Sequence, residues 1–228
     1  MTSGEAGAQA PAVIAVTPEA TIRQVAVSAM DNNIYLLTSA QTGDQILIDA
    51  AGDMARIGAL LRAAGRDAPQ TALRAIITTH AHRDHTGALG ALATATRATT
   101  LAGAADAAAI ARLTGVPVKR ELRHGDKVKV AGLVLDVIGL RGHTPGSIAL
   151  AYSQPDLPTR LFTGDSLFPG GVGNTEGDPA RFQQLMTDVT ARVFEVYDDS
   201  AVVHPGHGAP TTLGAERPQL AAWWRRGW

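Results

Sequence analysis

The chain has 228 residues, of which 45% are hydrophobic, so it is long enough to bury a substantial core within one domain. Its formal net charge is −1 and it has no long basic block, which gives no electrostatic reason to expect a nucleic acid or an anionic membrane as partner. It contains no cysteine, which excludes disulfides, thiolate metal ligands and cysteine nucleophiles.

The N-terminal stretch shows no secretory or membrane signal. Residues 1–20 have neither a basic n-region nor an apolar h-region, and no apolar run in the chain approaches the roughly 18 residues that span a bilayer. We therefore expect a cytoplasmic protein. Residues 1–11 are rich in Gly, Ala, Ser and Pro and indicate a flexible tail, with a single folded domain over 12–228.

The first half of the chain alternates strand-like and helix-like segments. The polar run Asp31-Asn32-Asn33 predicts a turn between the first two strands, and Asp53 and Gly65 are suited to begin and end the first helix. The predicted segments are, in order, strands over 21–30, 34–38 and 45–48, a helix over 54–64, a strand over 73–78, and Ala-rich helices over 86–96 and 104–113.

The second half continues the alternation. Asp178 followed by Pro179 is typical of a helix start, and the apolar stripe after it, at helical spacing, is assigned to core. The predicted segments are strands over 128–138 with a break at Gly132, over 148–152, 161–163 and 201–203, the helix that follows Asp178, and a terminal helix over 214–224.

The densest polar motif is Thr79-His80-Ala81-His82-Arg83-Asp84-His85, which directly follows a buried strand. Imidazole and carboxylate donors suit zinc, manganese or iron. Because four donors on one tight turn cannot all reach one ion with good geometry, we expect two neighbouring ions to share them.

Three further strand-end loops supply additional donors. His143 lies between glycines, Asp165 follows the strand over 161–163, and His207 follows the last strand. Loops at one edge of packed sheets can converge on a single site. With the first motif, these residues complete a set of seven donors.

The motifs THAHRDHTG, GHTPGS, TGD and PGHG, in this order, resemble the metal-binding motifs of the metallo-β-lactamase superfamily, over roughly residues 30–215. The resemblance implies an α/β fold, the four-layer αββα sandwich, with metals at one edge between two sheets. It implies two divalent ions, with zinc expected and iron or manganese as alternatives. One ion would be held by His80, His82 and His143, the other by Asp84, His85 and His207, with Asp165 bridging both.

The same resemblance implies a mechanism, in which hydroxide generated between the ions attacks an acyl carbonyl. Asp84 is the candidate catalytic residue, because it could orient the nucleophile as well as bind metal. His204 has no counterpart in the ligand set, and we expect it either to support a ligand or to be exposed.

Within the superfamily, TGDSLF and PGHG resemble the glyoxalase II-like (hydroxyacylglutathione hydrolase-like) branch, which implies a small-molecule thioester as substrate. After His207 only residues 208–228 remain, too few for the helical domain that binds glutathione in full-length glyoxalase II, and they show no clear Lys and Arg cluster. The identity of the thiol carrier and the oligomeric state are left open.

Four alternatives remain beside the thioesterase hypothesis. A persulfide (sulfur) dioxygenase of this superfamily would use one iron held by His80, His143 and Asp165. A lactone or β-lactam hydrolase would use the same two ions on another carbonyl. A nuclease is disfavoured by the near-neutral charge, and a non-enzymatic member by the complete donor set.

Overall fold

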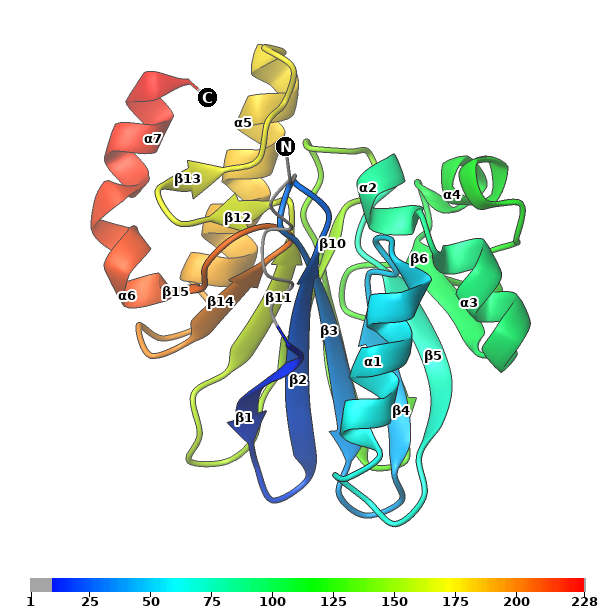
Figure 1. Cartoon of the computed structure of the whole chain (residues 1–228). Helices are drawn as coiled ribbons and strands as arrows, with labels where there is room; N and C mark the ends of the chain where they lie inside the picture. Colours follow the sequence, from blue (N-terminus) through cyan, green and yellow to red (C-terminus); the bar gives the residue numbers. More distant parts are fainter. Residues whose placement is uncertain (1–9, 228) are drawn as a thin grey trace, which may run out of the picture.

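The computed structural model describes residues 10–227, and most of the tail predicted at 1–11 lies outside the described residues. Two β-sheets pack face to face, with helices covering the outer face of each, so the predicted four-layer αββα sandwich is confirmed (Figure 1). The first sheet contains, in spatial order, β1 (Ala12–Val16), β2 (Ala20–Val27), β3 (Asn32–Ser39), β4 (Asp44–Ile48), β5 (Ala72–Thr78), β6 (Thr99–Gly103) and β7 (Arg120–Leu122).

The second sheet faces the first across the central core. Its strands, in spatial order, are β15 (Thr211–Thr212), β14 (Val202–Pro205), β11 (Arg160–Gly164), β10 (Ile148–Tyr152), β9 (Leu133–Gly139) and β8 (Lys127–Val130). A separate two-stranded hairpin follows β11 and consists of β12 (Leu167–Phe168) and β13 (Gly171–Val172).

Helices from the two halves of the chain cover opposite outer faces (Figure 1). On the first sheet lie α1 (Met54–Ala64), α2 (Arg83–Thr86), α3 (Leu89–Thr96) and α4 (Ala107–Thr114). On the second lie α5 (Pro179–Val189) with a π-helical extension over Thr190–Phe194, α6 (Leu213–Glu216), a 3₁₀ turn over Arg217–Gln219, and α7 (Leu220–Arg226).

Three apolar cores fill the spaces between the four layers, and β3 shows how one strand serves two of them. Its side chains point alternately to opposite faces. Tyr35 and Leu37 therefore lie in the core between the sheets, whereas Ile34 and Leu36 pack beneath the helices of the first sheet. The third core, between the second sheet and α5, includes Trp223 from α7.

The strand predicted over 21–30 ends at Val27, and residues 28–31 form the turn. Two further local predictions are wrong, and in both cases a long-range hydrogen bond to backbone is the reason. Asn32 and Asn33 belong to buried β3 and not to the turn, because the amide of Asn33 donates to the carbonyls of Pro205 (3.0 Å) and Gly208 (2.9 Å). The helix predicted over 86–96 breaks between α2 and α3, where the N–H groups of Gly87 and Ala88 bond the loop after β4.

Several short strands lack a pattern that the sequence could reveal. The strand β6, for example, is covered on both faces, so it does not alternate apolar and polar residues. It nevertheless matters for the site, because β4, β5 and β6 run parallel and their carboxyl ends meet at one edge of the sheet.

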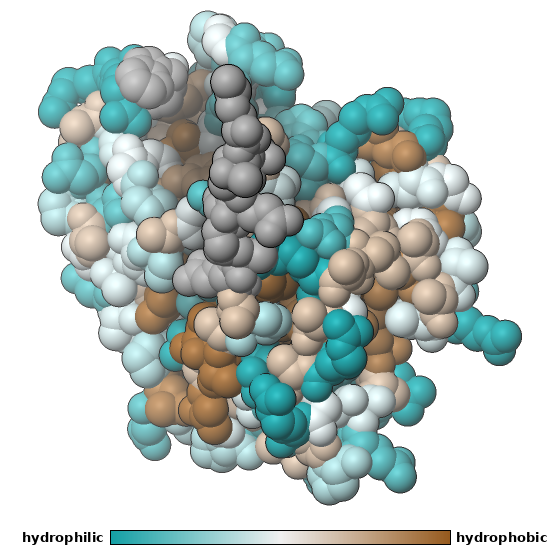
Figure 2. Space-filling model, in the orientation of Figure 1, coloured by the Kyte–Doolittle hydropathy of each residue, from teal (hydrophilic) through white to brown (hydrophobic). Residues whose placement is uncertain are grey.

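The surface is mixed in polarity. On the face drawn in Figure 2, hydrophobic residues gather near the edge strand β1, whose Val13 and Val16 are exposed. Within residues 10–227, none of the helices is both long enough and apolar enough to cross a lipid bilayer.

Candidate metal centre

The seven predicted donors lie together at one edge of the sandwich, between the two sheets. The turn after β5 and α2 supply the first four, the loop between β9 and β10 supplies His143, and the segments after β11 and β14 supply Asp165 and His207. Since β11 and β14 are parallel neighbours, their carboxyl ends bring Asp165 and His207 to the same place. The donors form three overlapping groups, each with its ligand atoms within 4.8 Å of one another; the third, made of His80, His85 and Asp165, joins the two clusters described next.

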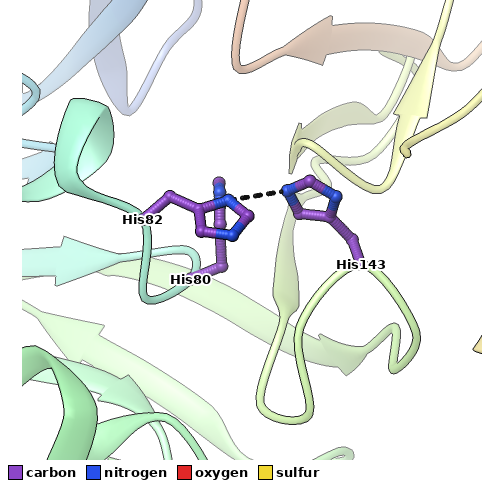
Figure 3. Close-up of side chains that lie close together, drawn as sticks. All are labelled: His80, His82 and His143. Carbon is purple, nitrogen blue, oxygen red and sulfur yellow. Dashed lines mark hydrogen bonds between the residues drawn. The ribbon is translucent and has the colours of Figure 1, made fainter. Parts of the chain in front are cut away.

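The first group is the three-histidine cluster of His80, His82 and His143. His80 and His82 come from the turn after β5, and His143 approaches them from the opposite sheet (Figure 3). The Nε2 atom of His143 lies 3.0 Å from Nδ1 of His82, and each ring meets the other two edge to face. Ring nitrogens that converge in this way can coordinate one cation.

The second group is the carboxylate cluster of Asp84, His85 and His207. The Nε2 atom of His207 lies 3.2 Å from Oδ2 of Asp84 and 3.1 Å from Nε2 of His85. Asn32 donates a 3.0 Å hydrogen bond to the same Asp84 oxygen, which orients the carboxylate. Asp84 is 29% exposed, so this side of the centre is open to solvent.

Asp165 lies between the two clusters. Its Oδ2 atom is 3.4 Å from Nε2 of His207, in the carboxylate cluster. The same oxygen is 3.7 Å from Nε2 of His143 and 4.0 Å from Nε2 of His80, in the three-histidine cluster. A carboxylate at this position can be shared by two neighbouring cations.

Four of the histidines are tethered through Nδ1, which decides what their other ring nitrogen can do. His80 Nδ1 contacts Thr79 Oγ1 at 3.0 Å and His85 Nδ1 contacts Asp49 at 2.9 Å. His143 and His207 donate to the carbonyls of Asn174 (2.7 Å) and Met30 (2.8 Å). With the proton held on Nδ1, His80 and His143 direct an Nε2 lone pair at the centre, the arrangement expected of metal ligands. Burial would lower the pKa of His85, but Asp49 and Asp165 outweigh it and raise this pKa to about 10. The hydrogen bond with Asp165 also raises the pKa of His207, so a divalent cation would have to displace the Nε2 protons of these two rings.

The electrostatics of the centre fit divalent cations. Nε2 of His80 and Oδ1 of Asp165 are buried and have no hydrogen-bond partner among the described residues. Burial lowers the pKa of His80 and of His143, which favours the neutral imidazole that binds metal. Burial would raise the pKa of Asp165, but hydrogen bonds from His207 and His85 outweigh it and keep this carboxylate ionised.

Asp49, which follows β4, supports the carboxylate cluster and was not predicted as a site residue. Its carboxylate accepts hydrogen bonds from the backbone N–H of Thr79 (2.7 Å), the hydroxyl of Thr79 (2.8 Å) and the ring of His85. The sequence signal was available, because an apolar strand that ends in aspartate is the same pattern that identified Asp165.

Asp106, at the start of α4, joins the two loops of the three-histidine cluster. It accepts hydrogen bonds from the N–H of Ala81 (2.9 Å), the hydroxyl of Thr144 (2.6 Å) and the N–H of Gly146 (2.8 Å). Only 2% of Asp106 is exposed, so these bonds are shielded from water. No local pattern identifies this residue, since it stands before an Ala-rich helix.

His204 lies outside the donor set. It is buried, its ring stacks on Phe162 with centroids 5.2 Å apart, and its Nε2 lies 3.3 Å from Nη1 of Arg160. From the sequence we expected His204 either to support a ligand or to be exposed, and the expectation of exposure is wrong. The neighbouring Pro205 carbonyl accepts a hydrogen bond from Tyr35 (2.7 Å), which fixes the start of the segment that carries His207.

The fold and the site define the class of this protein. A model of the metallo-beta-lactamase superfamily matches residues 28–207, and the chain belongs to this superfamily. The matched range contains all seven donors.

Individual relatives agree with the family. A hydroxyacylglutathione hydrolase of Anaeromyxobacter dehalogenans is 37% identical over 78% of this chain, which covers 61% of the length of that protein. Among solved structures, ETHE1 from Myxococcus xanthus is 29% identical with a TM-score of 0.74, over 90% of this chain and 87% of that one. TTHA1623 in a di-iron-bound form is 29% identical with a TM-score of 0.66, over 85% of this chain and 96% of that one.

Proposed function

We propose that this protein is a dinuclear metal-dependent hydrolase that attacks an acyl carbonyl, with a thioester as its substrate. The observation that carries the proposal is the position of Asp165, whose carboxylate faces ring nitrogens of both clusters. Six donors arranged around one shared carboxylate suit two cations better than one.

Two divalent cations bound here would supply Lewis acidity and lower the pKa of water toward neutrality. The residues of this chain then have separate tasks. His80 and His143 present neutral Nε2 atoms, His85 and His207 would release their Nε2 protons to bind a cation, and Asp165 balances positive charge between the clusters. Asp84, oriented by Asn32 and partly exposed, is placed to accept a hydrogen bond from water and so to orient it toward the substrate.

A thioester is supported by the leaving group and by the relatives. A thiolate leaves without prior protonation, so the reaction needs no separate general acid. The curated relative of Anaeromyxobacter dehalogenans is named a hydroxyacylglutathione hydrolase, although this chain spans only 61% of its length. Zinc is the metal that we propose first, and the di-iron form of TTHA1623 makes iron the next candidate.

The test is metal quantification of the purified protein, together with turnover of a small panel of thioesters, lactones and β-lactams. His82→Ala should lose one equivalent of metal and lower thioester turnover by more than about 100-fold, while the protein stays folded. Arg66→Ala, at an exposed site after α1, is the matched control. Full thioester turnover by metal-free protein would contradict the proposal.

A mononuclear iron persulfide dioxygenase is the second candidate, because the ETHE1 neighbour fits it. In that case His80, His143 and Asp165 would hold a single iron. Oxygen consumption with glutathione persulfide, measured on protein loaded with one equivalent of iron, separates the two functions. Oxygen uptake without thioester turnover would favour the dioxygenase.

A further inference from the structure

A groove adjoins the three-histidine cluster, and its lining includes no residue of the carboxylate cluster. It has a volume of about 640 Å³, and its lining includes His82, His143, Arg141, Pro145, Ala180 and Arg181. Most of this lining is apolar, since the arginines contribute their methylene stems. A substrate bound at the metals therefore has room to extend in this direction.

A second hollow, of about 210 Å³, adjoins the groove and shares Arg141 and Pro145 with it. Its other basic lining residues are Arg123 and His124, from the loop before β8, and Arg192, from the π-helical extension of α5. Among the described residues that line it, none is a carboxylate. The apolar groove thus continues into a basic pocket.

Two of the three arginines at this basic pocket share one carboxylate. Arg141 donates two hydrogen bonds to buried Asp188 (2.9 and 3.0 Å), and Arg192 forms an ion pair with the same carboxylate at 3.3 Å. Two guanidinium groups thus share one negative charge. Within residues 10–227, Nη1 of Arg141 and the guanidinium of Arg123 have no hydrogen-bond partner, so both remain available to a ligand.

We propose that the basic pocket binds an anionic group, a carboxylate or a phosphate, on the thiol part of the substrate. This inference rests on the proposed thioesterase function. The acyl carbonyl would lie at the metals, the thiol part would extend along the apolar groove, and its anionic end would reach Arg141 and Arg123. Planar guanidinium groups suit both anions, because each can accept paired N–H donors.

Arg181 is not part of this proposal, although it also lines the groove. Its guanidinium donates to the carbonyls of Gly142 (2.8 Å) and His143, and it pairs with Glu176 at 2.7 Å. Its donors and its charge are therefore already engaged in holding the His143 loop. Arg181 therefore has a structural role, whereas Arg123 and Arg141 are the arginines proposed to contact the ligand.

The test measures binding and requires no turnover. Metal-loaded protein is titrated calorimetrically with three thioethers: S-methylglutathione, which carries carboxylates; S-methyl-coenzyme A, which carries phosphates; and neutral S-methyl-N-acetylcysteamine. We expect one or both anionic ligands to bind at least about ten-fold more tightly than the neutral ligand, and added salt to reduce the difference. Which anionic ligand is preferred identifies the source of the charge.

The variants Arg123→Ala and Arg141→Gln should each weaken binding of the preferred anionic ligand by about ten-fold and leave the neutral ligand unchanged. Arg123 is exposed, so its variant keeps the test valid if the change at Arg141 disturbs Asp188. Arg66→Ala is the control. Equal binding of charged and neutral ligands, or a charge preference that survives in the double variant, would overturn the proposal. A protein that hydrolyses no thioester would contradict the proposed function and leave this binding result standing.

Discussion

The three-histidine cluster and the carboxylate cluster differ in what holds them in place. In the carboxylate cluster, Asp49 touches the ligand His85 directly, and Asn32 touches Asp84. In the three-histidine cluster, Asp106 touches no ligand ring and instead bonds the residues next to them in the chain. A buried carboxylate thus touches a ligand ring only in the carboxylate cluster, whereas in the three-histidine cluster the rings of His80 and His143 are held by Thr79 and by the Asn174 carbonyl, and Asp106 fixes the spacing of the two loops.

This difference predicts that the two proposed metal ions respond to different substitutions. Support that touches a ligand ring controls its tautomer and basicity, whereas support of the backbone controls only the distance between ligands. Asp165 and the segment next to it belong to both clusters. Substitutions there should remove both ions together.

The largest effect is expected for Gly206→Ala. A methyl group at this position would lie 2.2 Å from Oδ1 of Asp165 and 2.7 Å from Cε1 of His85, so the shared carboxylate must move. Both ions should be lost and turnover should fall by more than about 100-fold. Metal analysis and thioester assays measure this, with Gly52→Ala, where a methyl group meets open space, as the control. Retention of two full equivalents of metal would contradict the shared position of Asp165.

Asp49→Asn should weaken the ion of the carboxylate cluster by about 10- to 100-fold and the other ion less, because Asp49 contacts the ring of His85 directly and reaches His80 only through the hydroxyl of Thr79. The amide replaces an acceptor oxygen with a donor, opposite groups that are themselves donors on Thr79 and His85. Competition with a chromophoric chelator resolves the two binding steps. Asp67→Asn is the control. Asp67 lies in the loop after α1, and its carboxylate pairs with Arg23 of β2.

Asp106→Asn should have the opposite selectivity and a smaller effect, about ten-fold on the ion of the three-histidine cluster. It acts through the backbone beside His80, His82 and His143 and not on their rings. The same chelator competition applies, and cobalt absorption spectra of the half-loaded protein report which cluster is affected. If both aspartate variants weaken the same ion, the separate support of the two clusters is wrong.

The smallest effect concerns His204, which shares a segment with His207 but belongs to neither cluster. Burial and the charge of Arg160 lower the pKa of His204 to about 3, below its ordinary value of 6.5. The unfolded chain therefore takes up this proton at higher pH, so the contribution of His204 to stability is complete above about pH 6.5 and is lost as the pH falls toward 3.

Between pH 7 and pH 5 this loss amounts to about 2 kcal/mol. The variant His204→Phe, which keeps a stacked ring without a titrating group, should show a correspondingly flatter decline of the free energy of unfolding. Denaturant unfolding of metal-free wild type and variant at several pH values tests this. Parallel pH profiles of the two proteins would contradict it.

The local sequence was sufficient to predict which seven residues come together as donors. Histidine and aspartate directly after apolar strands, with glycine beside them, predicted seven side chains that the structure brings together. Their roles as metal ligands remain predictions. The four-layer fold followed from the resemblance of the motifs, and the apolar periodicity after Asp178 was enough to predict α5.

The position of Asp49 at the end of an apolar strand is a local signal, but no local pattern records which groups Asp49 and Asp106 contact. Asp49 and Asp106 each lie more than twenty residues from most of the groups they bond, and parallel pairing of β4, β5 and β6 brings them to the site. The sequence alone places Asn32 in a turn, and only the folded structure shows the hydrogen bond that it donates to Asp84.

The physical reason is the range of the interactions involved. Side-chain chemistry and strand or helix periodicity are properties of neighbouring residues, so they can be read along the chain. The burial and hydrogen bonds that orient a ligand depend on which strands become neighbours, and this is decided only when the two sheets pack together.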